Sequence, residues 1–370
     1  MEQVKKHARV DVADVLRGFA VLAIILLHSI EHFNFYSYPD TSDQSVWLNF
    51  CDKAIWDGLF FAFGGKAYAI FALLFGFSFF IQHDNQRMRG KDFRARFAWR
   101  LLLLFIIGQF NAAFFTGEIL VMYSLVGFVL VLTCRLSTKV LAWLIAICML
   151  QPACIYNIIM AFVSPGCMMT GGSWEADWAA TYDVQSHGTF WETVRVNLVE
   201  GQLFSLGWAW DNGRIFQTAG LFMAGMLIGR QGWFLRDKLH YWGRVLAWAL
   251  IAFFPLYGID NMVGGYISNA TILSQLHIIL QSLYKLAFML LLVCGILFGY
   301  YCTTRLSRTL SLLIPYGKMS MTNYVTQGII GSALFYHWGL YLQLGRTASL
   351  GVGIIIFLVQ YAFCRFWVGR

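Results

Sequence analysis

The chain has 370 residues and a formal net charge of +8, and 59% of its residues are apolar while only 12% are charged. An ordinary soluble domain carries about 25% charged residues, so this composition excludes a soluble globular protein. It predicts an all-α, polytopic membrane protein in which residues 1–370 form a single transmembrane domain in a lipid bilayer. The positive charge needs no nucleic-acid partner, because cytoplasmic loops rich in lysine and arginine produce it.

Apolar stretches long enough to cross a hydrocarbon core of about 30 Å recur along the chain. They predict about ten transmembrane helices, at residues 12–32, 64–82, 96–115, 117–134, 138–163, 213–230, 242–260, 272–301, 313–336 and 347–368. We expect the first span to be retained, because Asp14 and Arg17 interrupt the start of any signal-like pattern. Residues 45–63 ("SVWLNFCDKAIWDGLFFAF") have apolar positions at helical spacing and are predicted to form a helix at the membrane interface.

Most basic residues fall in the loops on the side of the N-terminus, so both termini are predicted to be cytoplasmic. Residues 164–212 then form a long outer loop between the fifth and sixth spans, acidic on balance and rich in tryptophan. This loop is either an interfacial aromatic belt or an ordered cap over an outward-facing site. The eight cysteines contain no C-x-x-C pair, which argues against a metal site; Cys51 and Cys167 share the outer side, and their spacing leaves pairing open.

The first span, "DVLRGFAVLAIILLHSIEH", carries a stripe of ionisable residues. Arg17 and His28 are eleven residues apart, which places them on one helix face about 16 Å apart. Ionisable groups inside a bilayer are costly and typically mark function. His28 therefore suits a general base, with Glu31 or His32 fixing its tautomer. The alternative is structural, with Asp14 and Arg17 as an interfacial ion pair and His28 with Glu31 as a packing contact.

Three further patterns are polar. The segment "RMRGKDFRARFAWR", six basic residues before the third span, is either a product of the positive-inside rule or a funnel for anionic phosphates. Glu118, at the start of the fourth span, either caps that helix or faces His28 across an outer vestibule, near Gln109 and Asn111. Polar residues also line one face of the eighth span and one face of the ninth, where they either bind a substrate or hold helices together. They are His277, Gln281 and Lys285 in the eighth span and Thr322, Asn323 and Gln327 in the ninth.

Arg17 and His28, with ten residues between them, resemble the first-helix signature of the integral-membrane acyltransferases that modify surface polysaccharides. The segment "DVLRGFAVLAIILLH" also resembles the first helix of the heparan-glucosaminide N-acetyltransferases, which have asparagine at the position of His28. "AIFALLFGFSF", "GEIL" with Tyr123, and "YGKMSMTNYVTQ" resemble motifs of the YeiB-like bacterial inner-membrane proteins, known as domain of unknown function 418. This chain has Glu118 where that family has an aspartate, and it lacks the family's C-terminal G-P-x-E-x-x-x-R ending.

The acyltransferase resemblance implies transfer of an acyl group from a cytoplasmic acyl-CoA donor to an acceptor on the outer side. Arg17, Arg94, Arg96 and Arg100 would hold the donor, although the three later arginines only approximate the R-x-x-R signature of those enzymes. His28 would be the base, oriented by Glu31 or Glu118. The acceptor, a cell-envelope glycan or a small molecule, would contact Gln109, Asn111, His277, Lys285, Asn323 and Gln327.

The YeiB-like resemblance implies a bacterial inner-membrane location, and homo-oligomerisation stays open. The alternative function is a transporter or transport-associated protein, in which His28, Glu31, His277 and Lys285 form a proton or substrate pathway. A third hypothesis is a non-catalytic assembly factor, in which the polar stripes only hold helices together.

Overall fold

The computed structural model describes residues 10–31, 33 and 44–369, and within these ranges every regular element is helical. The first half of the chain forms α1 (Asp11–Ile30), α2 (Val46–Phe63), α3 (Ala67–Arg87), α4 (Arg94–Ala112), α5 (Leu120–Val126), α6 (Phe128–Thr133), α7 (Thr138–Met149), α8 (Pro152–Val163) and α9 (Trp174–His187). The second half forms α10 (Phe190–Leu198), α11 (Glu200–Asp211), α12 (Arg214–Gln231), α13 (Leu239–Met262), α14 (Ala270–Cys302), α15 (Thr304–Ser311), α16 (Ile314–Lys318), α17 (Ser320–Phe335) and α18 (Arg346–Val368). The all-α prediction is confirmed.

Five helical segments of the described chain are long and apolar enough to cross a membrane: Asp11–Ile30, Val46–Arg87, Arg236–Gly265, Ala270–Cys302 and Arg346–Val368. The pair α7 and α8, bent by 50°, is a sixth if it forms one broken span. The protein is therefore a multi-pass helical membrane protein, but the count of ten spans is not confirmed. One reason is that expected spans are interrupted: residues 117–134 divide into α5 and α6, and residues 313–336 divide into α16 and α17. The interfacial location of α2 stays a prediction.

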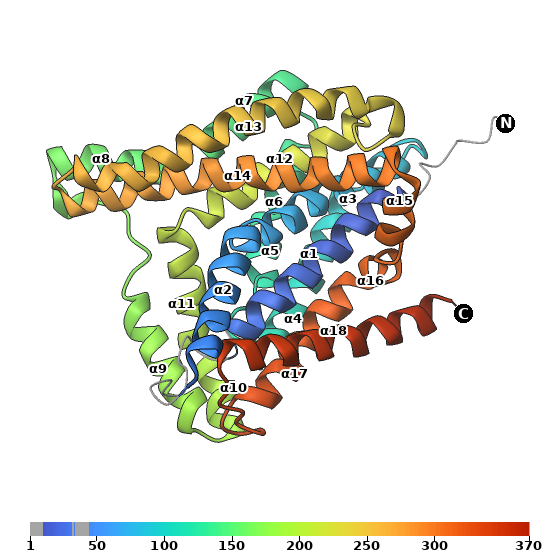
Figure 1. The fold of residues 1–370 in the computed structure, drawn as a ribbon. Coiled ribbons are helices and arrows are strands. Elements are labelled where there is room, and N and C mark those ends of the chain that lie inside the picture. The colour runs from blue at the N-terminus through green and yellow to red at the C-terminus, as the bar shows by residue number, and fades with distance from the viewer. Residues whose placement is uncertain (1–9, 32, 34–43, 370) are drawn as a thin grey trace.

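Helix α1 runs through the middle of the molecule and packs against α3, α16, α17 and α18 (Figure 1). The first turn of α1, the end of α3, the whole of α15 and the end of α18 lie on one side, at the right of Figure 1. We call this side the basic end, because Arg87, Arg305, Arg308 and Arg365 lie on these elements. His28, in the last turn of α1, lies toward the opposite end.

Helices α3 and α12 approach each other closely. A Cβ atom added to Gly76 would lie 1.9 Å from the carbonyl oxygen of Phe222, and one added to Gly225 would lie 1.8 Å from that of Leu73. Small residues at such positions let two backbones approach closely, as membrane helix pairs require. The glycines therefore fix the spacing of the two helices that line the pocket described below.

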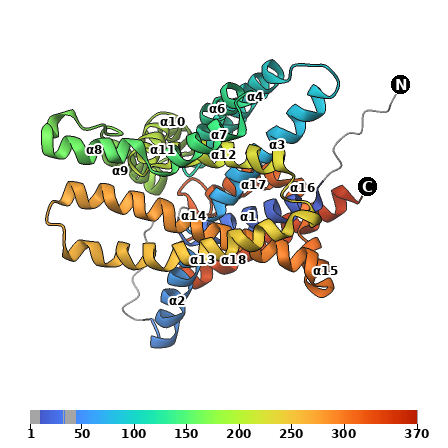
Figure 2. The same ribbon diagram turned by 90° about the horizontal axis from the view of Figure 1, so that it is seen from above.

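The chain bends between α7 and α8. Helix α7 ends before Gln151, which has a left-handed φ of 57°, and Pro152 begins α8. Proline lacks an N–H donor and suits the first position of a helix, so the chain bends here. Helices α13 and α14 form a long antiparallel hairpin, whose loop end projects to the same side of the molecule as α8 in Figure 2.

Residues 164–212, predicted as a long loop, are mostly helical and form α9, α10 and α11. The Asp211 carboxylate holds the segment together by accepting hydrogen bonds from the Gly171 N–H at 2.6 Å and the Trp174 indole N–H at 2.7 Å. All eight cysteines are free, Cys51 and Cys167 included.

Candidate functional site

His28 lies where α1, the end of α4 and α17 meet. Its imidazole is surrounded by aromatic rings, with ring centroids of Phe115, Phe33 and Tyr324 at 5.0, 6.0 and 6.4 Å. Phe115 follows α4, and Tyr324 belongs to α17. These rings hold the imidazole in a largely apolar environment near the end of α1.

Glu118 lies in the turn between α4 and α5 and is 3% exposed. Its carboxylate accepts hydrogen bonds from the backbone N–H groups of Leu120 at 2.5 Å and Val121 at 2.8 Å. This is the capping role that the sequence left open, because a carboxylate here satisfies the free N–H groups at the start of α5.

Tyr324 connects this turn to His28. Its hydroxyl donates a hydrogen bond to the Gly117 carbonyl at 3.2 Å and accepts one from the Ile119 N–H at 3.1 Å. Tyr324 therefore holds the two residues that flank Glu118, while its ring faces the imidazole of His28. Tyr324 therefore connects His28 to the turn that carries Glu118, the two residues that the sequence predicted to face each other.

Two buried amides lie in the same region. Asn111, in the last turn of α4, lies beside the Glu118 carboxylate, and a Cβ atom at Gly328 would lie 3.0 Å from Asn111 Oδ1. Gln327 is 0% exposed, and neither polar atom of its side chain has a hydrogen-bond partner among the described residues. Leaving a buried polar group unpaired costs about 1–3 kcal/mol, so Gln327 is available to a ligand. We call His28, Asn111, Glu118, Tyr324 and Gln327 the His28 cluster.

The spacing on α17 explains why its residues meet there. Tyr324, Gln327, Gly328 and Gly331 are at positions i, i+3, i+4 and i+7, which share one helix face. Gly331 lies against Phe33, because a Cβ atom there would be 2.2 Å from the Phe33 ring. This face of α17 therefore packs toward α1 and α4.

The helices formed by residues 164–212 cover the turn that carries Glu118. Gln185 of α9 donates hydrogen bonds to Asn197 of α10 at 2.7 Å and to the Thr116 hydroxyl at 3.3 Å. Asn197 in turn donates to the Ala113 carbonyl at 3.1 Å. These contacts support the ordered-cap interpretation of the segment over the aromatic-belt one.

Other predicted site residues lie elsewhere. Gln109 is half-buried and two residues before Asn111, so it projects from a different face of α4. Asn323 donates to the Tyr316 carbonyl at 3.0 Å, and its own carbonyl accepts from Gln360 of α18 at 3.0 Å. Asn323 thus joins α16, α17 and α18, which is the packing role we left open for the ninth span.

His277 and Lys285 belong to the α13–α14 hairpin and not to the His28 cluster. The His277 imidazole pairs with Asp260 of α13 at 2.7 Å, and the Lys285 ammonium donates to Gln281 at 2.7 Å. The hydrogen bond between Lys285 and Gln281 confirms that these two residues share one face of α14, while His277 pairs with α13.

Glu31 is buried and follows α1 as its C-cap residue. Its predicted role in orienting His28 stays a prediction, and His32, the alternative, lies outside the described residues.

Arg17 joins α1 to α3. Its guanidinium forms an ion pair with Asp14 at 2.5 Å and donates a hydrogen bond to the Ser78 hydroxyl at 2.5 Å. The ion pair expected from the i, i+3 spacing is present. These contacts already engage the Arg17 guanidinium, which the acyltransferase resemblance assigned to binding the acyl-CoA donor.

The basic segment before α4 does not act as one cluster. Arg94 makes charge-assisted hydrogen bonds to Asp92 at 2.7 and 3.0 Å, and Arg100 donates to Gln82 of α3. Arg96 is exposed. None of these three arginines is among the residues that line the pocket at this end of the molecule.

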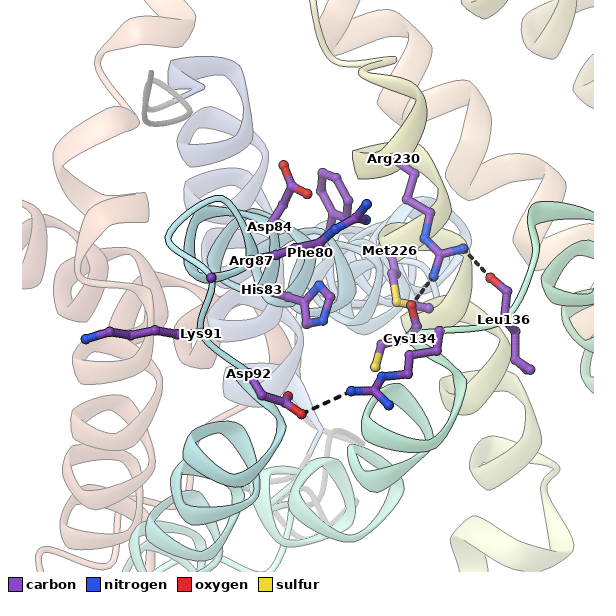
Figure 3. A pocket seen from close by; sticks show the side chains of 12 residues that line it. Phe80, His83, Asp84, Arg87, Lys91, Asp92, Cys134, Leu136, Met226 and Arg230 are labelled. Atoms are coloured by element: carbon purple, nitrogen blue, oxygen red, sulfur yellow. Dashed lines mark hydrogen bonds and ion pairs between the residues drawn. The ribbon is translucent and has the colours of Figure 1, made fainter. Parts of the chain in front are cut away.

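That pocket has a volume of about 650 Å³ and lies at the basic end, between α3, α12 and two connecting segments (Figure 3). Its size is within the range of about 300–1,000 Å³ that small-molecule and cofactor sites occupy. Its lining residues are Phe80, His83, Asp84, Arg87, Gly90, Lys91, Asp92, Cys134, Arg135, Leu136, Met226 and Arg230. Four of these side chains are cationic and two are carboxylates, so the pocket carries a net positive charge.

Hydrogen bonds fix two of the pocket arginines. Arg230 donates to the carbonyls of Leu136 at 2.8 Å and Cys134 at 2.6 Å, which satisfies backbone acceptors after α6. Arg135 lies 3.2 Å from the Asp92 carboxylate. Hydrogen bonds from the Arg94 side chain hold the pKa of Asp92 well below its usual range, so this carboxylate stays charged and positions Arg135.

Sequence reasoning missed Tyr324 and the pocket cations Arg135 and Arg230. Tyr324 lies within the segment "YGKMSMTNYVTQ", but an aromatic residue in a span gives no sign that its hydroxyl holds a distant turn. Arg135 and Arg230 are basic residues that the positive-inside rule alone explains, and nothing in the sequence shows that the end of α12 meets the α6–α7 connection.

Comparisons with known proteins bear on the family that the motifs predict. The model of the family described as "Protein of unknown function (DUF418)" matches residues 228–370. The uncharacterized protein YxaH of Bacillus subtilis (strain 168) is 24% identical over 98% of this chain and 90% of its own length. The uncharacterized 39.9 kDa protein in the amylase 3'region of Bacillus acidopullulyticus is 24% identical over 100% of this chain and 91% of its own length.

The uncharacterized protein YeiB of Escherichia coli (strain K12) is 23% identical over 96% of this chain and 91% of its own length. No solved structure matches the chain significantly. The predicted resemblance is confirmed: residues 228–370 match the model of the DUF418 family of unknown function, and the chain is similar to YeiB and YxaH over nearly its whole length.

Proposed function

We propose that this protein is a membrane-embedded acyltransferase that moves an acyl group from an acyl-CoA donor at the basic end to an acceptor at the His28 cluster. The observation that carries the proposal is the His28 cluster itself. Four separate elements bring an imidazole, a carboxylate and two amides together, and one amide, Gln327, has no partner among the described residues. Such an arrangement is costly unless it serves a ligand.

The donor site is the pocket at the basic end. Arg87, Lys91 and Arg135 line it from α3 and the two connecting segments. Arginine binds phosphate bidentately and lysine binds it as a point charge, so these residues suit the phosphates of coenzyme A. The set proposed from the sequence is thereby revised, because Arg94, Arg96 and Arg100 do not line the pocket.

The two sites lie toward opposite ends of α1. Arg17, which bonds Ser78 of α3 close to the pocket residue Phe80, is eleven residues from His28, or about 16 Å along the helix. The long pantetheine arm of the donor would carry the thioester across this separation.

In the reaction, His28 takes the proton from an acceptor hydroxyl or amine while that oxygen or nitrogen attacks the thioester carbon. The acyl–sulfur bond breaks and a new acyl–oxygen or acyl–nitrogen bond forms, and the proton held by His28 passes to the departing sulfur, which leaves as the thiol of coenzyme A. General-base catalysis of this kind contributes about 10²–10⁴-fold to the rate. Gln327 is placed to donate a hydrogen bond to the acceptor.

The test is transfer of radiolabelled acetyl groups from acetyl-coenzyme A into the glycan and small-molecule fractions of membranes that contain the protein. We expect His28→Ala to lower the transfer rate by about 10²-fold or more. His240→Ala, at an exposed histidine of α13, is the matched control and should keep the parent rate. Full transfer by His28→Ala in a correctly inserted protein would contradict the proposal.

Transport is the second candidate, favoured by the break between α7 and α8. Transporters often bind substrate where a span is broken and its half-helices point inward, and the 50° bend at Gln151 is such a feature. Substrate uptake by vesicles that depends on a pH gradient, with no acyl transfer, would favour this function.

A further inference from the structure

Three cationic side chains meet at the junction of α2 and α3, away from both sites described above. Lys66 lies between the two helices, Arg214 begins α12, and Lys285 lies near the middle of α14. Their like charges repel one another. We call these three residues the tri-cation cluster.

Gly65 brings two of the cations together. Its φ of +74° is a conformation that side chains rarely adopt, and a Cβ atom there would lie 3.0 Å from Lys285 Cδ and 3.4 Å from both terminal nitrogens of Arg214. Both side chains therefore pack on the bare backbone of this glycine. A larger residue at position 65 would displace them.

Lys66 completes the cluster from the other side of the junction. Its ammonium donates a hydrogen bond to the Phe61 carbonyl at 2.7 Å, and it lies 5.2 Å from the centre of the Phe288 ring. Phe288 is one turn beyond Lys285 on α14, so the two lysines approach the same helix. Lys66 is only 4% exposed, and burying a cation without an anion is unfavourable.

Arg214 is held in place by aromatic rings and not by a carboxylate. Its guanidinium carbon lies 4.5 Å from the centre of the Tyr68 ring and 5.5 Å from that of Trp208. It also donates to Gln217 Oε1 at 3.3 Å. These contacts orient the guanidinium but leave its positive charge unbalanced.

The cluster has no balancing carboxylate within ion-pair distance in the part of the chain that the structure describes. Asp260, the carboxylate that faces α14 from α13, pairs with His277 at 2.7 Å and not with a cation of the cluster. Two helices also begin here, α3 after Lys66 and α12 at Arg214, and helix N-termini add partial positive charge. The bend at Gln151 adjoins the same place, because a Cβ atom at Gly213 would lie 2.5 Å from Gln151 Oε1.

We propose that the tri-cation cluster binds a phosphate group that carries two negative charges, either inorganic phosphate or a phosphate monoester. A dianion balances three cations better than a carboxylate does, and the fork of an arginine with two lysine point charges is a recurring way to bind phosphate. Arg214 and Lys285 are only partly buried, which leaves the cluster accessible. The site is separate from the basic-end pocket and stands whether or not the protein is an acyltransferase.

The test is thermal unfolding of the purified full chain in detergent as inorganic phosphate is added, with chloride at matched ionic strength as reference. A ligand that binds only the folded protein raises the melting temperature with concentration. We expect the parent to be stabilised by phosphate and Lys285→Gln and Arg214→Gln to lose most of that response. Lys53→Gln, at an exposed lysine paired with Asp57, is the matched control and should respond like the parent.

A second control separates this site from the basic-end pocket. Arg87→Gln removes a pocket cation, so a phosphate response that survives in Arg87→Gln but not in Lys285→Gln assigns the binding to the tri-cation cluster. In phosphate-free buffer, Lys285→Gln should also melt at a higher temperature than the parent, because it removes repulsion and keeps a donor for Gln281. No response in the parent, an equal response in Lys285→Gln, or a lower melting temperature of that variant without phosphate would overturn the proposal.

The source of the phosphate is resolved by a parallel titration with phosphatidic acid in mixed micelles, compared with phosphatidylcholine. Stabilisation by phosphatidic acid that is larger than that by inorganic phosphate, and lost in Lys285→Gln, assigns the site to a lipid headgroup. A larger response to inorganic phosphate assigns it to a soluble ligand.

Discussion

At the residue scale, the ionisable stripe of α1 divides into parts with different surroundings. Arg17 is engaged by Asp14 and Ser78, so it joins two helices at the basic end. His28, at the other end, is surrounded by aromatic rings. The stripe was evident from the sequence because Arg17 and His28 share one helix face. The partners of each residue were not, since most come from helices far along the chain.

Glu118 illustrates how one residue can carry a structural role beside a chemical one. Its carboxylate caps α5 through two backbone N–H groups, and losing a cap costs about 0.5–2 kcal/mol. We therefore expect Glu118→Ala to lower the free energy of unfolding by about 1–2 kcal/mol, measured by thermal unfolding in detergent. Glu118→Asp, which keeps the carboxylate, should lose less; equal stability of the parent and Glu118→Ala would show that the cap contributes nothing.

At the element scale, sequence patterns identified the long apolar helices α1, α14 and α18 and failed where helices break. The expected fourth span is divided into α5 and α6, and the expected ninth into α16 and α17. Hydropathy alone cannot locate such breaks, because the residues on both sides are equally apolar. It also could not reveal that residues 164–212 fold into three helices over the Glu118 turn, since those contacts depend on side chains far apart in sequence.

The contact of α3 with α12 gives a test of helix packing. A Cβ atom at Gly76 would lie 1.9 Å from the carbonyl oxygen of Phe222, so Gly76→Ala must separate the helices. We expect a loss of about 1–3 kcal/mol of stability, the usual cost of overpacking, seen as a lower melting temperature. Gly58→Ala in α2, where no atom lies within 4 Å of the added Cβ, should instead be neutral or gain up to about 1 kcal/mol. The reverse order would contradict the packing described.

At the scale of the whole molecule, the orientation in the membrane is a prediction that two native cysteines can test. Cys167 and Cys302 are both exposed and free. Cys167 lies in the segment predicted to be outer, and Cys302 ends α14 at the basic end. In intact spheroplasts, a membrane-impermeant maleimide should label Cys167 and spare Cys302, while lysis should expose both. Labelling of Cys302 alone before lysis would reverse the orientation.

The most direct test of the proposed function asks whether the basic-end pocket binds the donor. We would measure thermal stabilisation of the purified protein by coenzyme A and acetyl-coenzyme A, with Arg87→Gln and Arg89→Gln beside the parent. Arg87 lines the pocket and Arg89, two residues away and also exposed, does not. A lost charged hydrogen bond is worth about 1.5–3 kcal/mol, so Arg87→Gln should bind coenzyme A at least about tenfold more weakly, and Arg89→Gln should match the parent. No stabilisation of the parent, or equal loss in both variants, would contradict a donor site in this pocket.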